Sequence, residues 1–187
     1  MTMQSLFSSK DDLLDYLEQG NRVKYLFFWG HTPKQSGVVD QSCLSQWFPA
    51  EFVINGTSYP TAEHYMMAEK ARLFSDQVAQ KKILAASHPG DAKKLGRTVC
   101  GYTEQKWLSH RFDIVLRGNI EKFHQNPELG DFLLKTGDRV LVEASPVDKI
   151  WGIGLEKTHG NANNPAKWPG LNLLGFALMA VRQGLRK

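Results

Sequence analysis

The chain has 187 residues, of which 42% are hydrophobic and 22% are charged. This length suits one domain with a hydrophobic core of its own, and this composition excludes a chain in which disorder dominates. The formal net charge of +4 fits an anionic ligand such as a phosphorylated metabolite or a nucleic acid, although many metabolic enzymes carry a similar excess.

Several classes of protein are excluded by what the sequence lacks. No apolar run approaches the length of a membrane span, and Met1–Asp12 has no apolar stretch that could act as a signal peptide, so we expect a cytoplasmic protein. Cys43 and Cys100 have no metal-ligand spacing and suggest no disulfide framework. The histidines show no ligand spacing such as His-Glu-x-x-His, so we expect no metal site and no cofactor.

The first elements expected along the chain are a short helix and a strand. Ser9–Glu18 begins with a serine that can cap a helix, carries acids in its first turn and is followed by Gly20. Lys24–Trp29 is rich in aromatic residues and is typical of a strand. Gly30–Ser42 contains proline, serine and glycine and predicts a loop.

A hairpin and a second helix are expected next. Asn55-Gly56 supplies the two positive φ values of a tight turn, so Glu51–Ile54 and Thr57–Tyr59 are predicted to pair as strands. Pro60 follows the hairpin. The segment Thr61–Phe74 is then predicted to form a helix with its threonine as the N-cap.

The predicted helix at 61–74 has two charged residues inside its apolar sector. At about 100° per residue, Glu63 and Lys70 point to the same side as four apolar residues. These are Met66, Met67, Leu73 and Phe74, whereas the opposite side carries Tyr65, Ala68, Glu69 and Arg72. Ionised groups are costly to bury without a partner, so the two either pair with each other in the core or line a ligand cavity. The sequence leaves both alternatives open.

The rest of the chain predicts four helices, a strand, a long loop and a final helix. The four helices are expected at Ser75–Ser87, Pro89–Gly96, Gln105–Phe123 and Pro127–Thr136. Arg139–Ala144 alternates like a strand, and Glu156–Gly170 is a glycine- and asparagine-rich loop of the kind that often binds a ligand. Leu171–Leu185 is apolar nearly all round and should form a central, buried helix.

Further side chains suited to ligand binding lie outside the helix at 61–74. Asp148 and Trp151 come just after the predicted strand, beside glycines that let a ligand approach the backbone closely. Trp107 can stack on a base or pack in the core. Asn172 opens an apolar helix, which it can cap, or its amide can bind a ribose hydroxyl. Together, these carboxylates, tryptophans, lysine and asparagine suit a protein that binds a nucleoside-like ligand better than an enzyme of acyl or phosphoryl transfer.

Short motifs follow one another in a characteristic order from about Phe28 to Arg182. They are Leu44-Ser-Gln-Trp-Phe-Pro49, Tyr59-Pro-Thr-Ala-Glu-His-Tyr65 with Lys70-Ala71, Leu95-Gly-Arg97, Trp107, Lys122-Phe123, Leu133-Leu134 with Thr136-Gly-Asp138, Val142-Glu-Ala-Ser145, Asp148 with Trp151-Gly-Ile-Gly-Leu155, and Leu171-Asn-Leu-Leu-Gly175 with Leu178-Met179 and Arg182. Each motif is short, but their conjunction is specific. Together they resemble the NADAR family, also called YbiA-like.

This resemblance implies a fold class and a domain organisation. The expected fold is α+β, a single compact and predominantly helical domain with a small β-sheet, over residues 25–187. Residues 1–24 lie outside the resemblance and are expected to form an N-terminal helical extension.

The resemblance also implies an activity, the hydrolysis of N-glycosidic bonds. In bacterial relatives the substrates are ribosylamine phosphate intermediates of riboflavin synthesis, so the expected function is an N-glycosidase for phosphorylated ribosylamino-pyrimidines. Some relatives remove ADP-ribose from guanine in DNA, and an ADP-ribosyl glycohydrolase acting on nucleic acid is therefore one alternative. A non-catalytic module that binds NAD or ADP-ribose is another. The expected partner is a phosphorylated ribosyl or ADP-ribosyl small molecule, without a membrane.

The site residues carried over by matching motif fall into two groups. The catalytic pair is Glu63 and Asp148, and the substrate-binding residues are Gln46, Lys70, Arg97, Trp107, Trp151 and Asn172. Gln46 stands where asparagine is commoner in the family, which keeps an amide but lengthens its reach.

The chemistry of the reaction agrees with these residue types. Breaking a ribosyl C–N bond develops positive charge on the sugar and basicity on the leaving nitrogen, so a carboxylate near each helps. We expect Glu63 to be the acid/base or cation-stabilising group and Asp148 to hold the water or a ribose hydroxyl, two roles that can be exchanged. The two tryptophans would hold the base by stacking, and Lys70 would bind phosphate or orient Glu63.

Overall fold

The computed structural model describes residues 7–186 and has the expected α+β class, with helices predominating. These residues divide into two units, the first made of residues 7–45 and 128–186 and the second of residues 46–127. Among the helices of residues 7–186, none combines the length of a membrane span with its apolar composition. The predicted boundary at residue 25 is not tested by this division and stays a prediction, and residues 1–6 of the expected extension lie outside the described residues.

The first unit is built on a parallel pair of strands. Strand β1 (Tyr25–Phe28) pairs with β4 (Val140–Glu143), with Tyr25 opposite Val140 and Phe28 opposite Glu143. Both strands match those predicted. Helix α7 (Leu173–Leu185) packs against β4. The approach is so close at Gly175 that a Cβ there would overlap the carbonyl oxygen of Leu141, so only glycine fits.

Shorter elements complete the first unit. They are α1 (Lys10–Glu18), the 3-10 turns η1 (Gln41–Leu44) and η2 (Pro165–Lys167), and α6 (Pro127–Lys135). Helix α1 begins with the predicted serine cap, because the Ser9 side chain accepts from the Asp12 amide while the Asp12 carboxylate accepts from the Ser9 amide. Lys10 at its start donates to the carbonyl of Trp168 at 3.2 Å, which joins α1 to the long loop that contains η2.

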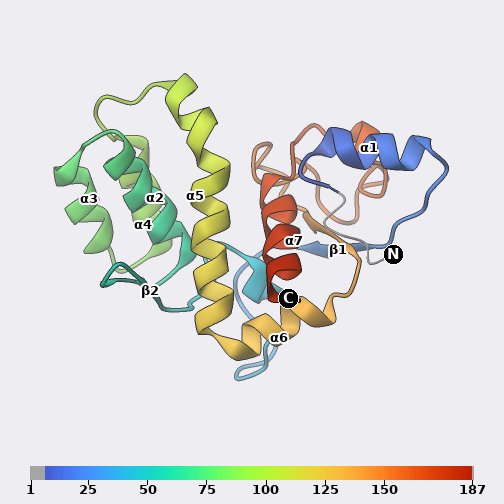
Figure 1. Ribbon diagram of the computed structural model, residues 1–187, viewed down its shortest axis with the longest axis horizontal. Helices are drawn as coiled ribbons and strands as arrows, with labels where there is room; N and C mark the ends of the chain where they lie inside the picture. The colour runs from blue at the N-terminus through green and yellow to red at the C-terminus, as the bar shows by residue number, and fades with distance from the viewer. Residues whose placement is uncertain (1–6, 187) are drawn as a thin grey trace. The chain divides into compact units, whose positions relative to one another are not determined.

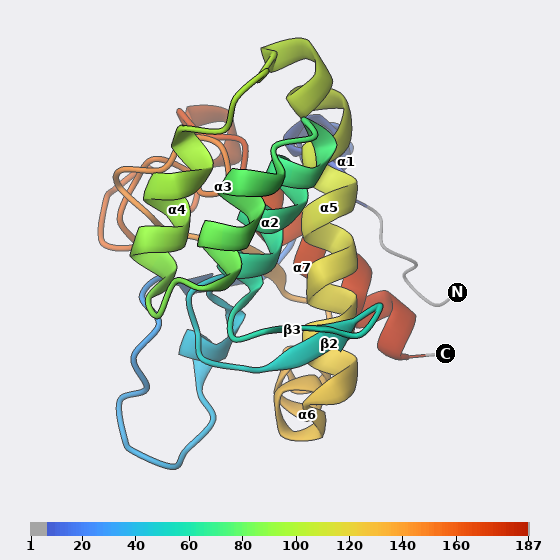
Figure 2. The same cartoon turned by 90° about the vertical axis from the view of Figure 1, so that its left-hand side faces the viewer.

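The second unit contains a hairpin and four helices. The hairpin pairs β2 (Phe52–Ile54) with β3 (Thr57–Tyr59) around the predicted Asn55-Gly56 turn, both of whose residues have positive φ. The helices are α2 (Ala62–Leu73), α3 (Gln77–Leu84), α4 (Pro89–Arg97) and α5 (Glu104–Gln125). Figures 1 and 2 show α2 lying among α3, α4 and α5, and it packs against all three.

The central place of α2 corrects the prediction that it has one apolar and one polar side. Glu63, Met66 and Met67 are buried as expected, but so are Tyr65 and Ala68 on the side predicted to face water. Glu69 on that side is also buried, and its carboxylate is bound in bidentate fashion by Arg72, whose contacts are 2.7 to 3.0 Å long. A helix with neighbours on three sides buries residues around most of its circumference, whatever its own periodicity.

The expected small β-structure is present as two two-stranded sheets among the described residues. The remaining predicted helices are confirmed, with ends that differ from the expected ones by up to three residues. The final helix is central to its unit as predicted, with Leu174 and Phe176 fully buried.

Candidate functional site

The start of α2 is held in place by two neighbouring side chains. Thr61 caps the helix as predicted, since its hydroxyl accepts from the amide of His64. The ring of His64 is fully buried, with Nδ1 2.8 Å from the Thr61 hydroxyl and Nε2 3.0 Å from the carbonyl oxygen of Ala86. Burial lowers the pKa of His64. A neutral imidazole therefore links the first turn of α2 to the end of α3.

Glu63 lies in this same first turn and is 2% exposed. Its backbone amide donates to the carbonyl of Gln46 at 3.0 Å, which fixes the first turn against the segment that precedes the hairpin. A carboxylate so well buried is costly to keep ionised unless other groups stabilise its charge. The structure thus confirms that Glu63 faces inward rather than towards bulk water.

Two turns along α2, the ammonium of Lys70 lies among aromatic rings. It is 4.5 Å from the ring centroid of Tyr102 and 5.5 Å from that of Trp107. Lys70 Nζ donates to the carbonyl of Gly96 at 2.7 Å, so its hydrogen bond goes to α4 and not to the carboxylate of Glu63. This arrangement does not support the alternative of a structural Glu63–Lys70 ion pair.

Positive charge is concentrated around Lys70. Burial, and after it the nearby charge of Arg97, lower the pKa of Lys70. Arg97 is exposed at the end of α4, and Tyr102 is 43% exposed. The ammonium of Lys70 thus has a second cation and two aromatic rings as neighbours, and no carboxylate contributes to its pKa shift. These surroundings suit a ligand that combines a phosphate with a planar ring.

Behind the start of α2 lies a pair of buried amides. Gln46 is 6% exposed and Asn119 of α5 is fully buried. Asn119 Nδ2 donates to Gln46 Oε1 at 2.8 Å and to the carbonyl of Val115 at 2.9 Å, which fixes the orientation of both amides. Among the described residues, Gln46 Nε2 and Asn119 Oδ1 have no hydrogen-bond partner. The pair therefore holds Gln46 in place while leaving a donor and an acceptor unused.

In the first unit, Asp148 caps the turn that leads to Trp151. Its Oδ1 accepts from the backbone amides of Ile150 and Trp151, each at 2.8 Å, and its own amide donates to the Ser145 hydroxyl at 3.2 Å. These contacts fix the direction of the carboxylate and leave Oδ2 without a hydrogen bond among the described residues. The local turn thus holds the carboxylate of Asp148 against the backbone of Trp151.

Asn172 is fully buried and does not cap the helix that it precedes. It precedes α7 in the left-handed conformation, with φ of 56°, and its side chain makes no capping hydrogen bond. Instead its Oδ1 accepts from the amide of Glu143 and its Nδ2 donates to the carbonyl of Leu141, both at 2.9 Å. The helix-cap alternative is therefore wrong, because the amide bonds the backbone of β4. Substrate binding by Asn172 stays a prediction.

The predicted residues fall into two clusters, one in each unit. The second unit contains Gln46, Glu63, Lys70, Arg97 and Trp107, and the first contains Asp148, Trp151 and Asn172. Tyr102 was not predicted from the sequence. It lies in the turn before α5, directly after Gly101, whose φ is 70°. Asn119 was not predicted either, and its only signal is an amide in the middle of a long helix. Within residues 7–186, no three His, Cys, Asp or Glu side chains are placed to hold a metal ion.

Comparison with known proteins decides the family. The model of the NADAR domain matches residues 27–186. The chain belongs to the NADAR family. This confirms the resemblance found in the motifs and extends it over most of the chain.

Individual NADAR relatives are similar over most of this chain. The chain is 48% identical over 165 residues to N-glycosidase R617 of Acanthamoeba polyphaga mimivirus, which covers 86% of this chain and 95% of the relative. It is 34% identical over 144 residues to riboflavin biosynthesis protein VVA0006 of Vibrio vulnificus, covering 77% of this chain and 35% of that longer protein. It is 33% identical over 132 residues to N-glycosidase YbiA of Escherichia coli, covering 71% and 74%.

The solved structure of E. coli YbiA has the same fold. Its NMR structure superposes with a TM-score of 0.68 at 25% sequence identity, covering 89% of this chain and 87% of that one. The α+β, predominantly helical fold expected for a NADAR protein is thereby confirmed.

Proposed function

We propose that this NADAR protein hydrolyses the ribosyl C–N bond of phosphorylated ribosylamino-pyrimidine intermediates of riboflavin biosynthesis. Its enzyme class is confirmed, because relatives in the mimivirus and in E. coli are N-glycosidases by name, so the chain is a hydrolase of N-glycosidic bonds. The pyrimidine substrate is supported by the Vibrio relative, which is named a riboflavin biosynthesis protein. The cytoplasmic location expected from the sequence stays a prediction.

The observation that carries this proposal is the set of side chains presented by α2 and its neighbours. Lys70 lies over the rings of Tyr102 and Trp107 and near Arg97, and the buried Glu63 lies on the same helix. A ribosylamine phosphate offers a phosphate for the cations, a pyrimidine for the rings and a glycosidic nitrogen for the acid. Each part of the substrate thus has a matching group in the second unit.

The chemical roles follow from the environment of each carboxylate. Glu63, buried in the first turn of α2, gives a proton to the leaving nitrogen or stabilises the positive charge that develops on the ribose. Asp148, held by two backbone amides, offers Oδ2 to the attacking water or to a ribose hydroxyl. The reaction consumes one water, whose hydroxyl adds to ribose C1 while its proton balances the amine that leaves. The two carboxylate roles can be exchanged.

The remaining predicted residues, apart from Asn172, bind substrate in this proposal. Trp107 stacks on the pyrimidine, and Lys70 with Arg97 bind the phosphate. Trp151 is assigned to substrate binding from the family resemblance alone. Gln46, kept in place by Asn119, offers Nε2 to the substrate. Asn172 acts through the backbone of β4, which it ties to the start of α7.

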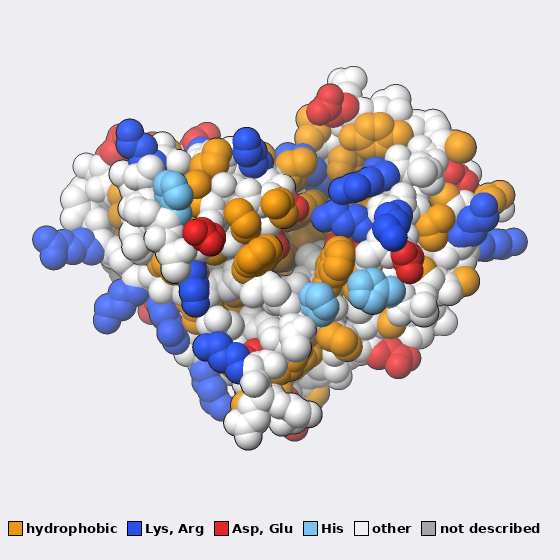
Figure 3. All heavy atoms as spheres, turned by 180° about the vertical axis from the view of Figure 1, so that it is seen from behind, with side chains coloured by type: hydrophobic (Ala, Val, Ile, Leu, Met, Phe, Trp, Pro, Cys, Tyr) orange, Lys and Arg blue, Asp and Glu red, His pale blue; other side chains and the backbone are white. Residues whose placement is uncertain are grey.

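An ADP-ribosyl glycohydrolase acting on guanine in nucleic acid is the alternative that the net charge of +4 permits. On the face seen in Figure 3, Lys and Arg side chains are interspersed with hydrophobic and acidic ones. Nucleic-acid binding through phosphates requires several lysines and arginines acting together and falls steeply with salt.

The test is a turnover assay with both substrate classes. The purified protein is incubated either with a phosphorylated ribosylamino-pyrimidine or with DNA that carries ADP-ribosylated guanine, and the released pyrimidine or ADP-ribose is measured by mass spectrometry. We expect release from the first substrate. Release from the DNA alone would replace the proposed substrate by the alternative, and release from neither would contradict both and leave the non-catalytic binder.

A further inference from the structure

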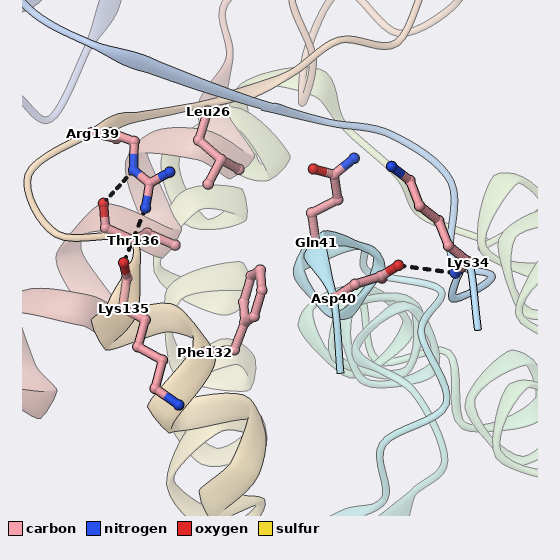
Figure 4. Close-up of a pocket in the computed structure, with 8 residues that line it drawn as sticks. All are labelled: Leu26, Lys34, Asp40, Gln41, Phe132, Lys135, Thr136 and Arg139. Carbon is pink, nitrogen blue, oxygen red and sulfur yellow. Dashed lines mark hydrogen bonds between the residues drawn. The ribbon is translucent and has the colours of Figure 1, made fainter. Parts of the chain in front are cut away.

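A cavity of about 350 Å³ lies in the first unit, within the size range of small-molecule sites. Its lining comes from β1, the loop that precedes η1, the end of α6 and the turn before β4, as Figure 4 shows. We call it the Arg139 cavity, and its lining residues are Leu26, Lys34, Asp40, Gln41, Phe132, Lys135, Thr136 and Arg139. None of them was predicted to bind substrate.

One wall of the Arg139 cavity presents a fixed guanidinium. Arg139 Nε donates to the carbonyl of Thr136 at 2.8 Å, and its Nη2 donates to the carbonyl of Lys135 at 3.0 Å. The third nitrogen, Nη1, makes no hydrogen bond with any residue from 7 to 186, and in Figure 4 the nitrogen without a dashed line points towards the cavity. Because two carbonyls already orient this side chain, little conformational entropy is lost when an anion binds it.

The opposite wall carries an ammonium and an amide, and its only carboxylate is already engaged. Asp40 Oδ2 accepts from the amide of Lys34 and Asp40 Oδ1 accepts from that of Ser42, both at 2.9 Å. These hydrogen bonds, which lower the pKa of Asp40 against the effect of burial, fold the loop so that the side chains of Lys34 and Gln41 extend towards each other in Figure 4. Asp40 therefore shapes the wall through its hydrogen bonds, and the nearby charge of Lys34 also lowers its pKa.

A second cation, Arg182, contacts the turn before β4 that lines the Arg139 cavity. Arg182 of α7 is 6% exposed, and its Nη1 donates to the Thr136 hydroxyl at 2.7 Å and to the Arg139 carbonyl at 3.0 Å. Both acceptors are neutral, and no carboxylate among residues 7–186 lies within salt-bridge distance of Arg182. Buried charges are normally paired. The hydrogen bonds of the Arg182 guanidinium thus go to neutral acceptors, while the charge of Asp138 acts on it from beyond salt-bridge distance. An anion bound in the cavity would stabilise this guanidinium further.

The positive region continues into a neighbouring cavity of about 500 Å³. The two cavities share Lys135, Thr136 and Arg139, and the second adds Arg22 and Lys24. Its carboxylate, Asp138, is paired with Arg186 at 2.8 Å. Lysines and arginines therefore outnumber the carboxylates in both cavities, and both carboxylates are bound by other groups.

We propose that the Arg139 cavity is a second binding site, for a small organic phosphate with a planar apolar body. Arg139 contacts the phosphate oxygens, Leu26 and Phe132 contact the planar body, and the ammonium of Lys34 on the opposite wall attracts the anion through its charge. A phosphate dianion can accept hydrogen bonds from several cations at once, which a carboxylate does less well. Contact with Leu26 and Phe132 favours an organic phosphate over the inorganic ion. This site is independent of the proposed hydrolysis.

The test uses phenyl phosphate as the probe and the intact protein labelled with ¹⁵N. Amide chemical shifts of Leu26, Gln41 and Arg139 are followed during titration with phenyl phosphate, phenol and inorganic phosphate in separate samples. We expect saturable shifts at these amides with phenyl phosphate and clearly weaker binding of the other two compounds. Arg139→Gln should weaken phenyl phosphate binding by about tenfold, since a hydrogen bond to a charged group is lost.

A matched variant controls for the loss of charge alone. Lys82→Gln removes one positive charge from an exposed position on α3, outside the cavity lining, and should leave the binding constant unchanged. Equal binding to wild type and Arg139→Gln would overturn the proposal, as would shifts confined to other residues or the absence of binding at millimolar probe. Lys34→Gln, which changes the opposite wall, should repeat the loss and keeps the test decisive if Arg139→Gln fails to fold.

Discussion

At the scale of single residues, Lys70 connects the fold to the proposed chemistry. Its hydrogen bond to Gly96 holds it against α4, and its ammonium remains between Tyr102 and Trp107. The sequence identified Lys70 by its place in the apolar sector of its helix and Trp107 as a ring that can stack on a base. It could not show that they meet, because they come from different helices. Tyr102 was missed because a tyrosine in a turn has no periodic pattern that marks it.

Lys70 and Tyr102 should therefore affect substrate binding together. Lys70→Gln removes the charge that binds phosphate, and we expect KM for the ribosylamine phosphate to rise about tenfold, the value of a charged hydrogen bond. Tyr102→Leu should raise KM less, through the lost cation–π and stacking contacts. Tyr102→Phe keeps the ring and is the matched control. Steady-state kinetics would contradict this role if Tyr102→Phe and Tyr102→Leu behaved alike.

His64 makes stability depend on pH with a definite sign. Its pKa is lowered in the folded protein, so between that value and 6.5 the unfolded chain binds a proton that the folded one rejects. The free energy of unfolding should then fall as the pH drops below 6.5, by at most about 1.4 kcal/mol per pH unit for one proton. Urea unfolding at pH 7.5 and 5.5 measures this loss. The loss should be smaller in His64→Gln, and equal losses in the two proteins would count against it.

The buried amides of Gln46 and Asn119 should contribute to the free energy of unfolding. Asn119→Ala removes the donor that Gln46 Oε1 accepts from and leaves that oxygen unsatisfied, so we expect a loss of about 1 to 3 kcal/mol in the free energy of unfolding. Asn161→Ala, at an exposed loop position, is the control and should be neutral. Chemical denaturation of both variants gives the comparison, and a neutral Asn119→Ala would show that the pair does not stabilise the fold.

At the scale of elements, the position of α2 depends on glycines in its neighbours. A Cβ at Gly118 of α5 would overlap the ring of Tyr65, and one at Gly96 of α4 would overlap the sulfur of Met67. Helices α4 and α5 can approach α2 this closely only because these residues lack a side chain. The same approach brings Lys70 of α2 to Trp107 of α5.

Gly118→Ala should therefore disturb both stability and function. We expect a loss of about 1 to 3 kcal/mol from overpacking and a raised KM, because α5 must shift away from α2. In Gly184→Ala, by contrast, the new methyl meets no described atom within 4 Å, so this variant should be neutral or slightly stabilising. Thermal unfolding and kinetics of both variants test the packing, and equal melting temperatures would contradict it.

Helix and strand positions could be predicted because their signals are local. Ser9, Thr61 and Asn55-Gly56 act on residues within one turn of themselves, and all three were placed correctly. The burial of both sides of α2 could not be predicted, because periodicity records the character of one helix and not the number of its neighbours. Pairing of the strands into two sheets depends on partners more than a hundred residues apart for β1 and β4, which no local pattern fixes.

At the scale of the whole molecule, the conjunction of short motifs predicted the family and fold class correctly. It could not predict what each side chain of these motifs does, because that depends on its neighbours in space. Asn172 illustrates this, since its side-chain amide forms hydrogen bonds with the backbone of β4 and does not cap the helix that follows it. The motif Thr136-Gly-Asp138 likewise fixes Arg182 and Arg186 around a turn that no pattern marked as a binding site.

The division into two units also shapes the chemical account. Each unit carries one of the two carboxylates to which the proposal gives a role. The Asp148 carboxylate is held by backbone amides of its own unit, and the backbone of Glu63 is bound to Gln46 within the second unit. Loss of either carboxylate should therefore reduce turnover without unfolding the other unit.

The most direct test of the proposed chemistry is the rate at which Glu63→Gln releases the pyrimidine from a phosphorylated ribosylamino-pyrimidine. The control is Glu104→Gln, which changes the exposed acid in the first turn of α5 in the same way. With circular dichroism showing a folded protein, we expect Glu63→Gln to lose at least about a hundredfold in rate, the usual contribution of a general acid, and Glu104→Gln to keep the wild-type rate. Wild-type turnover by folded Glu63→Gln would contradict the account.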